Sequence, residues 1–213
     1  GRWLVAVGGA ASLVVGGLDG LAVGFRLPNQ DPEAIARGNA FVATASNPAA
    51  VYYNPAGLVQ LEGHEVQVGV YLLDVNVEYE TGGVRLENDS ELRPVPQVYY
   101  GWSPEGNFAV GLGVYAPYGL SLKWPDSASF RTLAREGELL YLTINPVVAW
   151  QIHPRLSIAA GPTFNVSEAE FKQGVLSAID LFKVKGDGFA TGFNAGLLWQ
   201  PHERVSVGIQ YRS

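Results

Sequence analysis

The chain has 213 residues, a net charge of −6, no cysteine and only 16% charged residues. Without cysteine it cannot build a disulfide framework or a thiolate metal site, and an acidic balance without a Lys/Arg cluster argues against a nucleic-acid partner. An average soluble domain has about 25% charged residues, so this composition, with 26 glycines and 11% aromatic residues, favours a β structure with one face in an apolar medium.

An apolar run from Trp3 to Leu18, ended by Asp19, opens the chain. The run is too short and too rich in glycine for a membrane-spanning helix. It is typical of a secretory signal peptide, with small residues at Gly20 and Ala22 for the cleavage site. We therefore expect residues 1–22 to be a signal peptide; a buried core helix or strand is the alternative.

The next segment, residues 23–62, is polar and rich in turn-forming residues, unlike everything after it. Two Asn-Pro-Ala triplets begin at Asn47 and Asn54, and each proline fixes its own φ and pushes the asparagine before it out of the helical region. Asp31-Pro32-Glu33 is typical of a helix start. We expect this segment to form a compact plug, or hatch; a loop-rich cap on a soluble domain is the alternative. Its key residues are Asn47, Pro48, Asn54, Pro55 and Ala56.

From Gly63 onward, apolar residues recur at every second position. The clearest case is Leu140 to Ile152, where Leu, Ile, Val and Trp alternate with Thr, Asn, Ala and Gln. This period of two predicts strands with one apolar face and one small or polar face. We expect about seven strands, at residues 63–72, 96–102, 108–114, 140–152, 156–166, 189–199 and 205–211.

The polar face of these strands distinguishes a membrane barrel from a soluble sheet. It carries Gly, Ala, Ser, Thr, Asn and Gln, whereas a face in water would be rich in Lys and Glu. The apolar face carries Trp102, Trp150 and Trp199 just before short turns, where a membrane interface places them. We therefore predict an all-β fold, in which residues 63–213 form an antiparallel transmembrane β-barrel around the hatch; a soluble sheet is the alternative.

The connections between the predicted strands alternate in length. Outer-membrane barrels have short periplasmic turns and long extracellular loops, which predicts a multi-pass protein of the cell outer membrane. Seven is an odd number of strands, and an open edge cannot face lipid because its N–H and C=O groups would have no partners. We therefore expect the chain to be part of a larger barrel. The short turns are 103–107, 153–155 and 201–204, and the long loops are 81–93, 118–138 and 174–188.

Several short motifs occur in the order and spacing of a known family. With them the chain resembles the N-terminal half of the outer-membrane long-chain fatty acid transporters of the FadL type, which include channels for aromatic hydrocarbons. The resemblance implies a barrel with an N-terminal hatch and passive uptake of hydrophobic molecules, above all long-chain fatty acids. The motifs are Gly24-Phe25-Arg26-Leu27, Ala36 to Ala40, Asn54 to Leu58, Tyr118-Gly119-Leu120, Phe164-Asn165, Gly192 to Gly196 and Tyr211-Arg212-Ser213.

The resemblance also implies a route for the substrate. Extracellular loops of the family collect it in a low-affinity groove, a second pocket lies against the hatch, and movement of the hatch releases the ligand to a lateral opening in the wall. Exposed apolar residues in the loop 118–138 fit such a groove, and interior tyrosines fit the pocket or the packing of plug against barrel. The candidate ligand residues are Phe25, Tyr71, Tyr99, Tyr115, Tyr118, Leu120, Leu122, Trp124, Phe130, Tyr141 and Lys172.

Lys172 is the nearest match to a basic residue that family members place on this strand. It is slightly displaced, and Glu168 and Glu170 lie beside it. Fatty acids and neutral hydrocarbons therefore both stay open as substrates. We interpret the two glutamates as marking where the strand leaves the membrane rather than as a catalytic pair.

No catalytic motif is present, since the chain lacks a Gly-x-Ser-x-Gly elbow, a P-loop and a His-Glu-x-x-His pair. His64, His153 and His202 lie far apart without metal-ligand spacing. We expect no enzyme, metal or cofactor, and a monomer whose partners are hydrophobic small molecules, outer-membrane lipid and lipopolysaccharide. A structural or adhesive outer-membrane protein with a static plug is the alternative function, and a secreted soluble β domain is a third.

Overall fold

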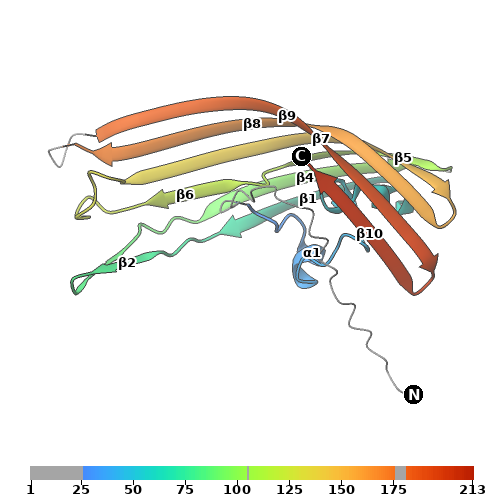
Figure 1. The fold of residues 1–213 in the computed structure, drawn as a ribbon, viewed down its shortest axis with the longest axis horizontal. Helices are drawn as coiled ribbons and strands as arrows, with labels where there is room; N and C mark the ends of the chain where they lie inside the picture. The colour runs from blue at the N-terminus through green and yellow to red at the C-terminus, as the bar shows by residue number, and fades with distance from the viewer. Residues whose placement is uncertain (1–25, 105, 176–180) are drawn as a thin grey trace, which may run out of the picture.

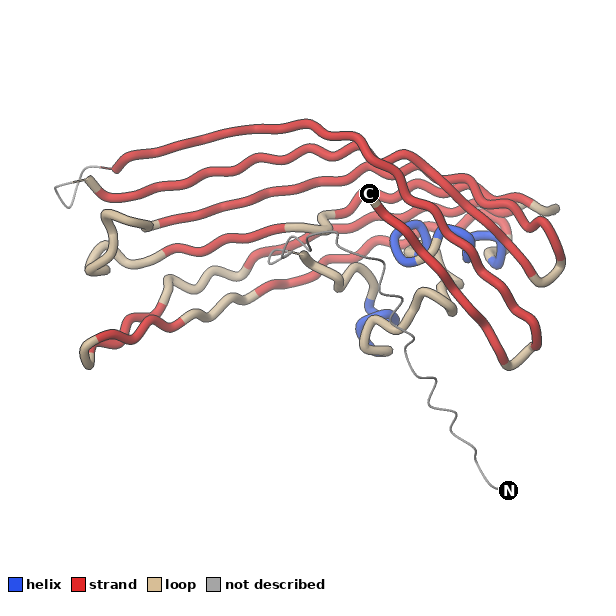
Figure 2. Tube along the Cα trace, viewed as in Figure 1, coloured by secondary structure: helices blue, strands red, loops and turns tan. Residues whose placement is uncertain are grey.

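The computed structural model describes residues 26–104, 106–175 and 181–213. They form an antiparallel sheet that arches over a small N-terminal segment (Figure 1). Figure 2 shows that the helices are confined to that segment beneath the sheet. The prediction of an all-β, antiparallel half-barrel is confirmed. The expected signal peptide, residues 1–22, and the candidate Phe25 lie outside the described residues.

Eight strands form the main sheet, in the order β1-β4-β5-β7-β8-β9-β10, with β6 paired to β7. A separate hairpin consists of β2 (Glu78–Thr81) and β3 (Val84–Glu87). Neighbouring strands are antiparallel. The strands of the main sheet are β1 (Gly63–Leu73), β4 (Arg93–Ser103), β5 (Phe108–Tyr115), β6 (Gly119–Lys123), β7 (Glu136–His153), β8 (Leu156–Gly174), β9 (Leu181–His202) and β10 (Val205–Arg212).

Strands also occur where the sequence predicts long loops. The β2–β3 hairpin and β6 lie in or beside two of these loops, and the predicted loop 174–188 is wrong from Leu181 onward. There β9 pairs with β8 in unbroken register, from Gly188 opposite Ser167 to Leu181 opposite Gly174. The physical reason is that ion pairs across the strands replace apolar contacts above the membrane: Lys183 pairs with Glu170, and Lys185 with Glu168.

The period of two divides the sheet into two faces. On the convex face Val66, Val68, Val148 and Trp150 are exposed, whereas inward-facing Tyr99 is fully buried. Apolar side chains in such numbers on a convex sheet face match the lipid-facing band of a membrane barrel.

The concave face holds residues 26–62, which we call the hatch segment. It contains α1 (Pro32–Ala36), α2 (Ala50–Tyr53) and a 3-10 helix, η1 (Pro55–Gln60). Asp31 caps α1 by accepting a hydrogen bond from the Ala34 amide at 2.7 Å, and proline occupies the first turn of α1 and of η1. The helix start predicted at Asp31 is therefore confirmed, and its proline offers a preset φ where no N–H is needed.

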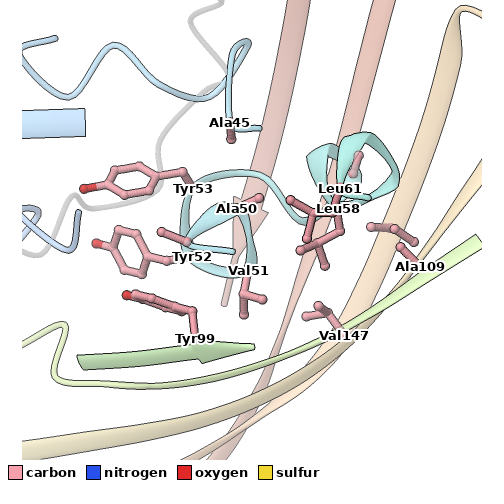
Figure 3. Packing of buried hydrophobic residues seen from close by; sticks show 14 of the residues in the cluster. Ala45, Ala50, Val51, Tyr52, Tyr53, Leu58, Leu61, Tyr99, Ala109 and Val147 are labelled. Atoms are coloured by element: carbon pink, nitrogen blue, oxygen red, sulfur yellow. The ribbon is translucent and has the colours of Figure 1, made fainter. Parts of the chain in front are cut away.

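The buried core lies between the hatch segment and the sheet. Val51, Leu58 and Leu61 of the hatch segment pack toward Ala109 and Val147 of the strands (Figure 3). This location explains why the inner face of the sheet is made of small and polar residues. Large side chains there would occupy the space that the hatch segment fills.

Two glycines on the inner face allow a close approach of the hatch segment to the strands. A Cβ atom added at Gly196 of β9 would lie 2.2 Å from Oδ1 of Asn54, and one at Gly208 of β10 would lie 2.3 Å from the carbonyl oxygen of Val42. Any side chain at these positions would therefore push the hatch segment away from the wall.

Candidate functional site

The wall of the sheet is interrupted between β4 and β6. Pairing of β4 with β5 ends at Val98 opposite Val114, while β6 pairs with β7. Within the described residues no ladder joins β4 to β6. Pro94 and Pro96 of β4 lie at this point, and sheets tolerate proline mainly at edges and bulges because it has no N–H to donate.

A cavity of about 320 Å³ lies at the interruption. Its lining is almost entirely apolar, and its one charged residue is Glu168. Small-molecule pockets measure about 300–1,000 Å³, so this cavity is at the small end of that range. It is lined by Leu27, Pro94, Val95, Pro96, Ala116, Tyr118, Gly119, Leu139, Leu140, Tyr141, Leu142, Val166, Ser167 and Glu168.

The start of the hatch segment covers the inner side of the interruption. The amide of Leu27 donates to the carbonyl oxygen of Pro117 at 2.7 Å, and Arg26 forms an isolated β-bridge with Tyr118. Nε2 of Gln30 donates to the carbonyl oxygen of Ala116 at 2.9 Å. The hatch segment thus supplies hydrogen-bond donors to backbone carbonyls that have left the sheet.

The candidate tyrosines fall into two groups. Tyr118 and Tyr141 line the cavity, with their rings edge to face at 5.1 Å. Tyr99 and Tyr115 are fully buried and stack on each other at 5.7 Å. The ring of Tyr52 from the hatch segment lies 5.2 Å from that of Tyr115. The second group therefore packs the hatch segment against the wall, which is the alternative that the sequence left open.

Tyr71 stands apart from both groups, because its hydroxyl accepts a hydrogen bond from Asn29 of the hatch segment at 3.0 Å.

The loop candidates are more enclosed than their sequence suggests. Trp124 is buried, and Phe130 sits edge to face with it at 5.1 Å and with Tyr79 of β2 at 4.7 Å. Leu120 and Leu122 of β6 are half-buried.

Exposed apolar side chains occur instead on the inner face of the β8 and β9 extensions. Phe171 is 57% exposed, Phe182 53% and Val184 49%. Sequence reasoning missed Phe182 and Val184 because it assigned residues 174–188 to a loop, and it missed Phe171 because it ended the preceding strand at residue 166. The alternation of Phe182 and Val184 with lysines was the available signal for a continuing strand.

Lys172 lies within an ion-pair network. Its Nζ is 2.9 Å from a carboxylate oxygen of both Glu136 and Glu170, and these two partners, Glu136 first, raise the pKa of Lys172. Lys183 also contacts Glu170 at 2.8 Å. Hydrogen bonds from Lys183 and Lys172 lower the pKa of Glu170 to about 2. A ligand carboxylate would have to displace a glutamate to reach Lys172.

Asn54 is fully buried and uses both ends of its amide. Nδ2 donates to the carbonyl oxygens of Val42 at 2.8 Å and of Leu197 in β9 at 3.0 Å, and Oδ1 accepts from the Ala56 amide at 3.2 Å. All three of these partners are backbone groups. Asn47 is half-buried and bonds only within the hatch segment, to Asp31, Glu33 and Ala49.

Two further asparagines, Asn145 of β7 and Asn194 of β9, connect the wall to the hatch segment. Nδ2 of Asn194 donates to the Val51 carbonyl at 3.0 Å and to Oδ1 of Asn145 at 2.9 Å, and the Tyr115 hydroxyl donates to the same Oδ1 at 3.0 Å. Sequence reasoning placed both asparagines on the inner face but did not single them out, because other inward residues share their parity and polarity.

Among the residues that the structure describes, no His, Asp and Glu side chains form a group of three or more that could hold a metal ion. No helix in the described ranges is long and apolar enough to cross a membrane.

A curved antiparallel sheet, apolar outside and packed around a hatch segment inside, defines a plugged outer-membrane barrel protein. The chain belongs to the family described as outer membrane protein transport protein (OMPP1/FadL/TodX), which residues 14–213 match. Family membership confirms the resemblance read from the sequence and places the chain in the outer membrane.

Individual relatives agree with that assignment. The chain is 25% identical to a protein of Neisseria meningitidis serogroup B that is named as an outer membrane protein, and the match covers 90% of this chain and 49% of that one. It is 27% identical to the 47 kDa outer membrane protein of Pasteurella multocida, over 96% of this chain and 52% of that one. The chain thus spans about half the length of the curated relatives it matches.

Two solved structures share the fold. A Pseudomonas aeruginosa FadL homologue matches with a TM-score of 0.78 at 18% identity, covering 89% of this chain and 52% of that one. The P. putida toluene transporter TodX matches with a TM-score of 0.63 at 14% identity, covering 78% and 51%.

Proposed function

We propose that the protein is a passive outer-membrane channel that takes up hydrophobic molecules and releases them sideways through the interruption between β4 and β6. The observation that carries this proposal is the apolar cavity at the interruption, which reaches from Leu27 and Tyr141 on the inner side to Leu140 and Val166 on the lipid side. A molecule in this cavity can pass from lumen to lipid without crossing water. Its own preference for an apolar medium then drives transfer.

The route begins at the long-loop end, which faces the medium in outer-membrane barrels. Exposed Phe171, Phe182 and Val184 form an apolar surface there that suits the collection of a dilute apolar ligand. The path continues over the inner face to Tyr118 and Tyr141. Release requires the start of the hatch segment, which covers the inner side of the interruption, to move.

The cargo class in this proposal is long-chain fatty acids or aromatic hydrocarbons. The family is described as a transport protein, and one structural neighbour is named a toluene transporter. Exclusion of enzymatic activity rests on the same family membership. Outer-membrane lipid and lipopolysaccharide would surround a single copy of the protein.

A structural or adhesive protein with a static plug is the alternative, and the strength of the hatch contacts favours it. Arg212 of β10 donates from Nη2 to the Tyr52 carbonyl at 2.7 Å, and its guanidinium lies 4.2 Å from the centre of the Tyr52 ring. Ser206 donates to the Ala43 carbonyl at 2.5 Å. A plug held this firmly need not move.

Filling the cavity separates the two functions. Gly119 lines the cavity, and a Cβ there would lie 3.3 Å from Leu27, so Gly119→Phe should abolish uptake of radiolabelled toluene by cells that lack their own transporter. Gly186→Phe is the matched control, because a Cβ at Gly186 meets no atom within 4 Å. Both full-length variants should show the heat-modifiable band of an assembled barrel. Uptake by Gly119→Phe at the wild-type level would refute the sideways route.

A further inference from the structure

The cavity at the wall interruption has a single charged residue, and it is an acid. Glu168 of β8 lies directly opposite Leu140 of β7, two pairs beyond Leu142 and Val166 and on the same face of the sheet. All four side chains line the lipid-side mouth of the cavity. A molecule that leaves sideways must therefore pass a carboxylate.

The positive partner of Glu168 stands one strand further from the interruption. Lys185 of β9 pairs with Glu168, and this hydrogen bond raises the pKa of Lys185, but Lys185 is absent from the cavity lining. Directly across from Glu168 on β9 is a second carboxylate, Asp187. A ligand in the cavity thus meets the carboxylate of Glu168 before the ammonium of Lys185.

The other cations at the long-loop end already have carboxylate partners. At the described long-loop end every Lys and Arg has a carboxylate within 4.0 Å, and several are shared between two. A ligand carboxylate would have to displace an existing partner at each of them, which gains no net ion pair. The pairs are Arg85 with Glu78, Arg93 with Glu91 and Glu138, Lys123 with Asp89 and Glu91, Arg131 and Arg135 with Asp126, Lys172 with Glu136 and Glu170, Lys183 with Glu170, and Lys185 with Glu168.

We propose that Glu168 makes the passage selective for neutral hydrophobic molecules over carboxylates of the same length. This inference rests on the proposed sideways route and adds the charge class of the cargo. Repulsion between like charges is weak in water but several times stronger at the lower effective dielectric of a protein site. An anionic head group in the apolar cavity would also lose its hydration, and no Lys or Arg is among the described residues that line this cavity.

Uptake of two labelled probes of equal chain length, decanol and decanoate, tests the proposal. At neutral pH the full-length protein in cells without their own transporter should take up decanol and largely exclude decanoate. Glu168→Gln should raise the decanoate-to-decanol ratio several-fold, and Glu168→Lys by about tenfold, a change of about 1.4 kcal/mol in relative barrier. Asp187→Asn is the matched control, since it removes a carboxylate from the same row but outside the cavity lining, and should change the ratio less than about twofold.

The outcomes are distinguishable. An unchanged ratio in both Glu168 variants, with decanol uptake at the wild-type level, overturns the role of Glu168 and leaves the channel intact. An equal shift in Asp187→Asn also overturns it, because the effect would then be a general surface potential, which raised salt should screen. If neither probe enters faster than in cells without the protein, the proposed channel fails, and the selectivity of Glu168 falls with it.

Discussion

Nδ2 of Asn145 donates a hydrogen bond to the carbonyl oxygen of Pro162 in the neighbouring strand, at 2.8 Å. The β7–β8 ladder explains why. Its pairs run to Ile144–Phe164 and resume at Val148–Ala160, so Pro146 lies opposite Pro162, and neither can donate an N–H. The side-chain amide replaces a backbone donor that the wall lacks near mid-depth.

Replacing Asn145 with alanine should therefore lower the free energy of unfolding by about 1 to 3 kcal/mol, because a buried carbonyl loses its donor. Pro146→Ala restores a backbone N–H opposite Pro162, so in that background the cost of Asn145→Ala should fall by at least about half. Urea unfolding in micelles measures both. Asn165→Ala is the control, as a buried inward asparagine away from the prolines. Equal costs in the two backgrounds would contradict the backbone-replacement role.

The convex face should behave as a lipid-facing surface whose tolerance depends on depth. Val148 is exposed near mid-depth, and Val205 is exposed at the short-turn end of β10. Val148→Arg should cost about 2 to 4 kcal/mol and Val205→Arg about 0 to 1 kcal/mol, as found for barrels at these depths. Reversible unfolding in lipid vesicles measures the free energy of unfolding of both variants. Equal costs would mean that this face is not in a membrane.

Asn54→Ala should loosen the hatch segment without preventing assembly, since the strands pair independently of it. The variant loses bonds to Val42, Leu197 and Ala56, worth about 1 to 3 kcal/mol for buried partners. We expect normal abundance, higher single-channel conductance and loss of saturable uptake. Asn47→Ala should change less, because Asn47 bonds only within the hatch segment. Unchanged conductance together with unchanged uptake would establish a static plug.

Gly196→Ala should disturb the same contact from the other side. Its Cβ would lie 2.2 Å from Oδ1 of Asn54 and 2.9 Å from Cδ of Pro55, so the hatch segment must shift. Higher conductance is the expected result. In an Asn54→Ala background, where the nearest atom is gone, Gly196→Ala should raise the conductance by less than it does in the wild type. Additive effects would mean that the glycine acts elsewhere.

The β8–β9 extension should loosen in acid. Lys183 and Lys172 hold the pKa of Glu170 at about 2 instead of its ordinary 4.5. A lowered native-state pKa stabilises the fold fully above pH 4.5, and this contribution disappears as the pH falls from 4.5 towards 2. Hydrogen exchange around Glu170, corrected for its intrinsic pH dependence, should accelerate over that window in the wild type. Glu170→Gln should remove the pH dependence, and an identical profile in both proteins would contradict the assignment.

Sequence periodicity was sufficient for the strands that cross the membrane and insufficient above it. From Leu140 to Ile152 the alternation of apolar and small residues is unbroken, and β7 follows it. From Leu181 to Gly188 the outward positions carry charges. The pattern of apolar alternation therefore stops there, and the sequence predicts a loop. In the structure that stretch is a strand, held by its continuous ladder with β8 and by the ion pairs of Lys183 and Lys185 with Glu170 and Glu168.

The candidate site was only partly predictable for a similar reason. Tyr141 could be chosen as a pocket residue from its inward parity, but so could Tyr99 and Tyr115, which have the same parity on their own strands, and Tyr118 lay in a predicted loop. Which tyrosine meets the hatch segment depends on its height in the wall. The opposition of Pro146 and Pro162 likewise depends on register between two strands, which no pattern within either strand specifies.

The hatch contacts also bear on the order in which the protein assembles. Asn54 bonds to Leu197, 143 residues later in the chain, and Ala43 accepts from Ser206, 163 residues later. The hatch segment, which is synthesised before these strands, therefore cannot form its contacts with β9 and β10 until nearly all of the strands exist, and contacts of such sequence separation form slowly. During that interval the hatch segment must stay unfolded without aggregating. Its asparagines, prolines and small residues keep an unfolded chain soluble in water. A hatch richer in large apolar residues would pack as tightly in the finished barrel and be more prone to aggregate in the periplasm before reaching it.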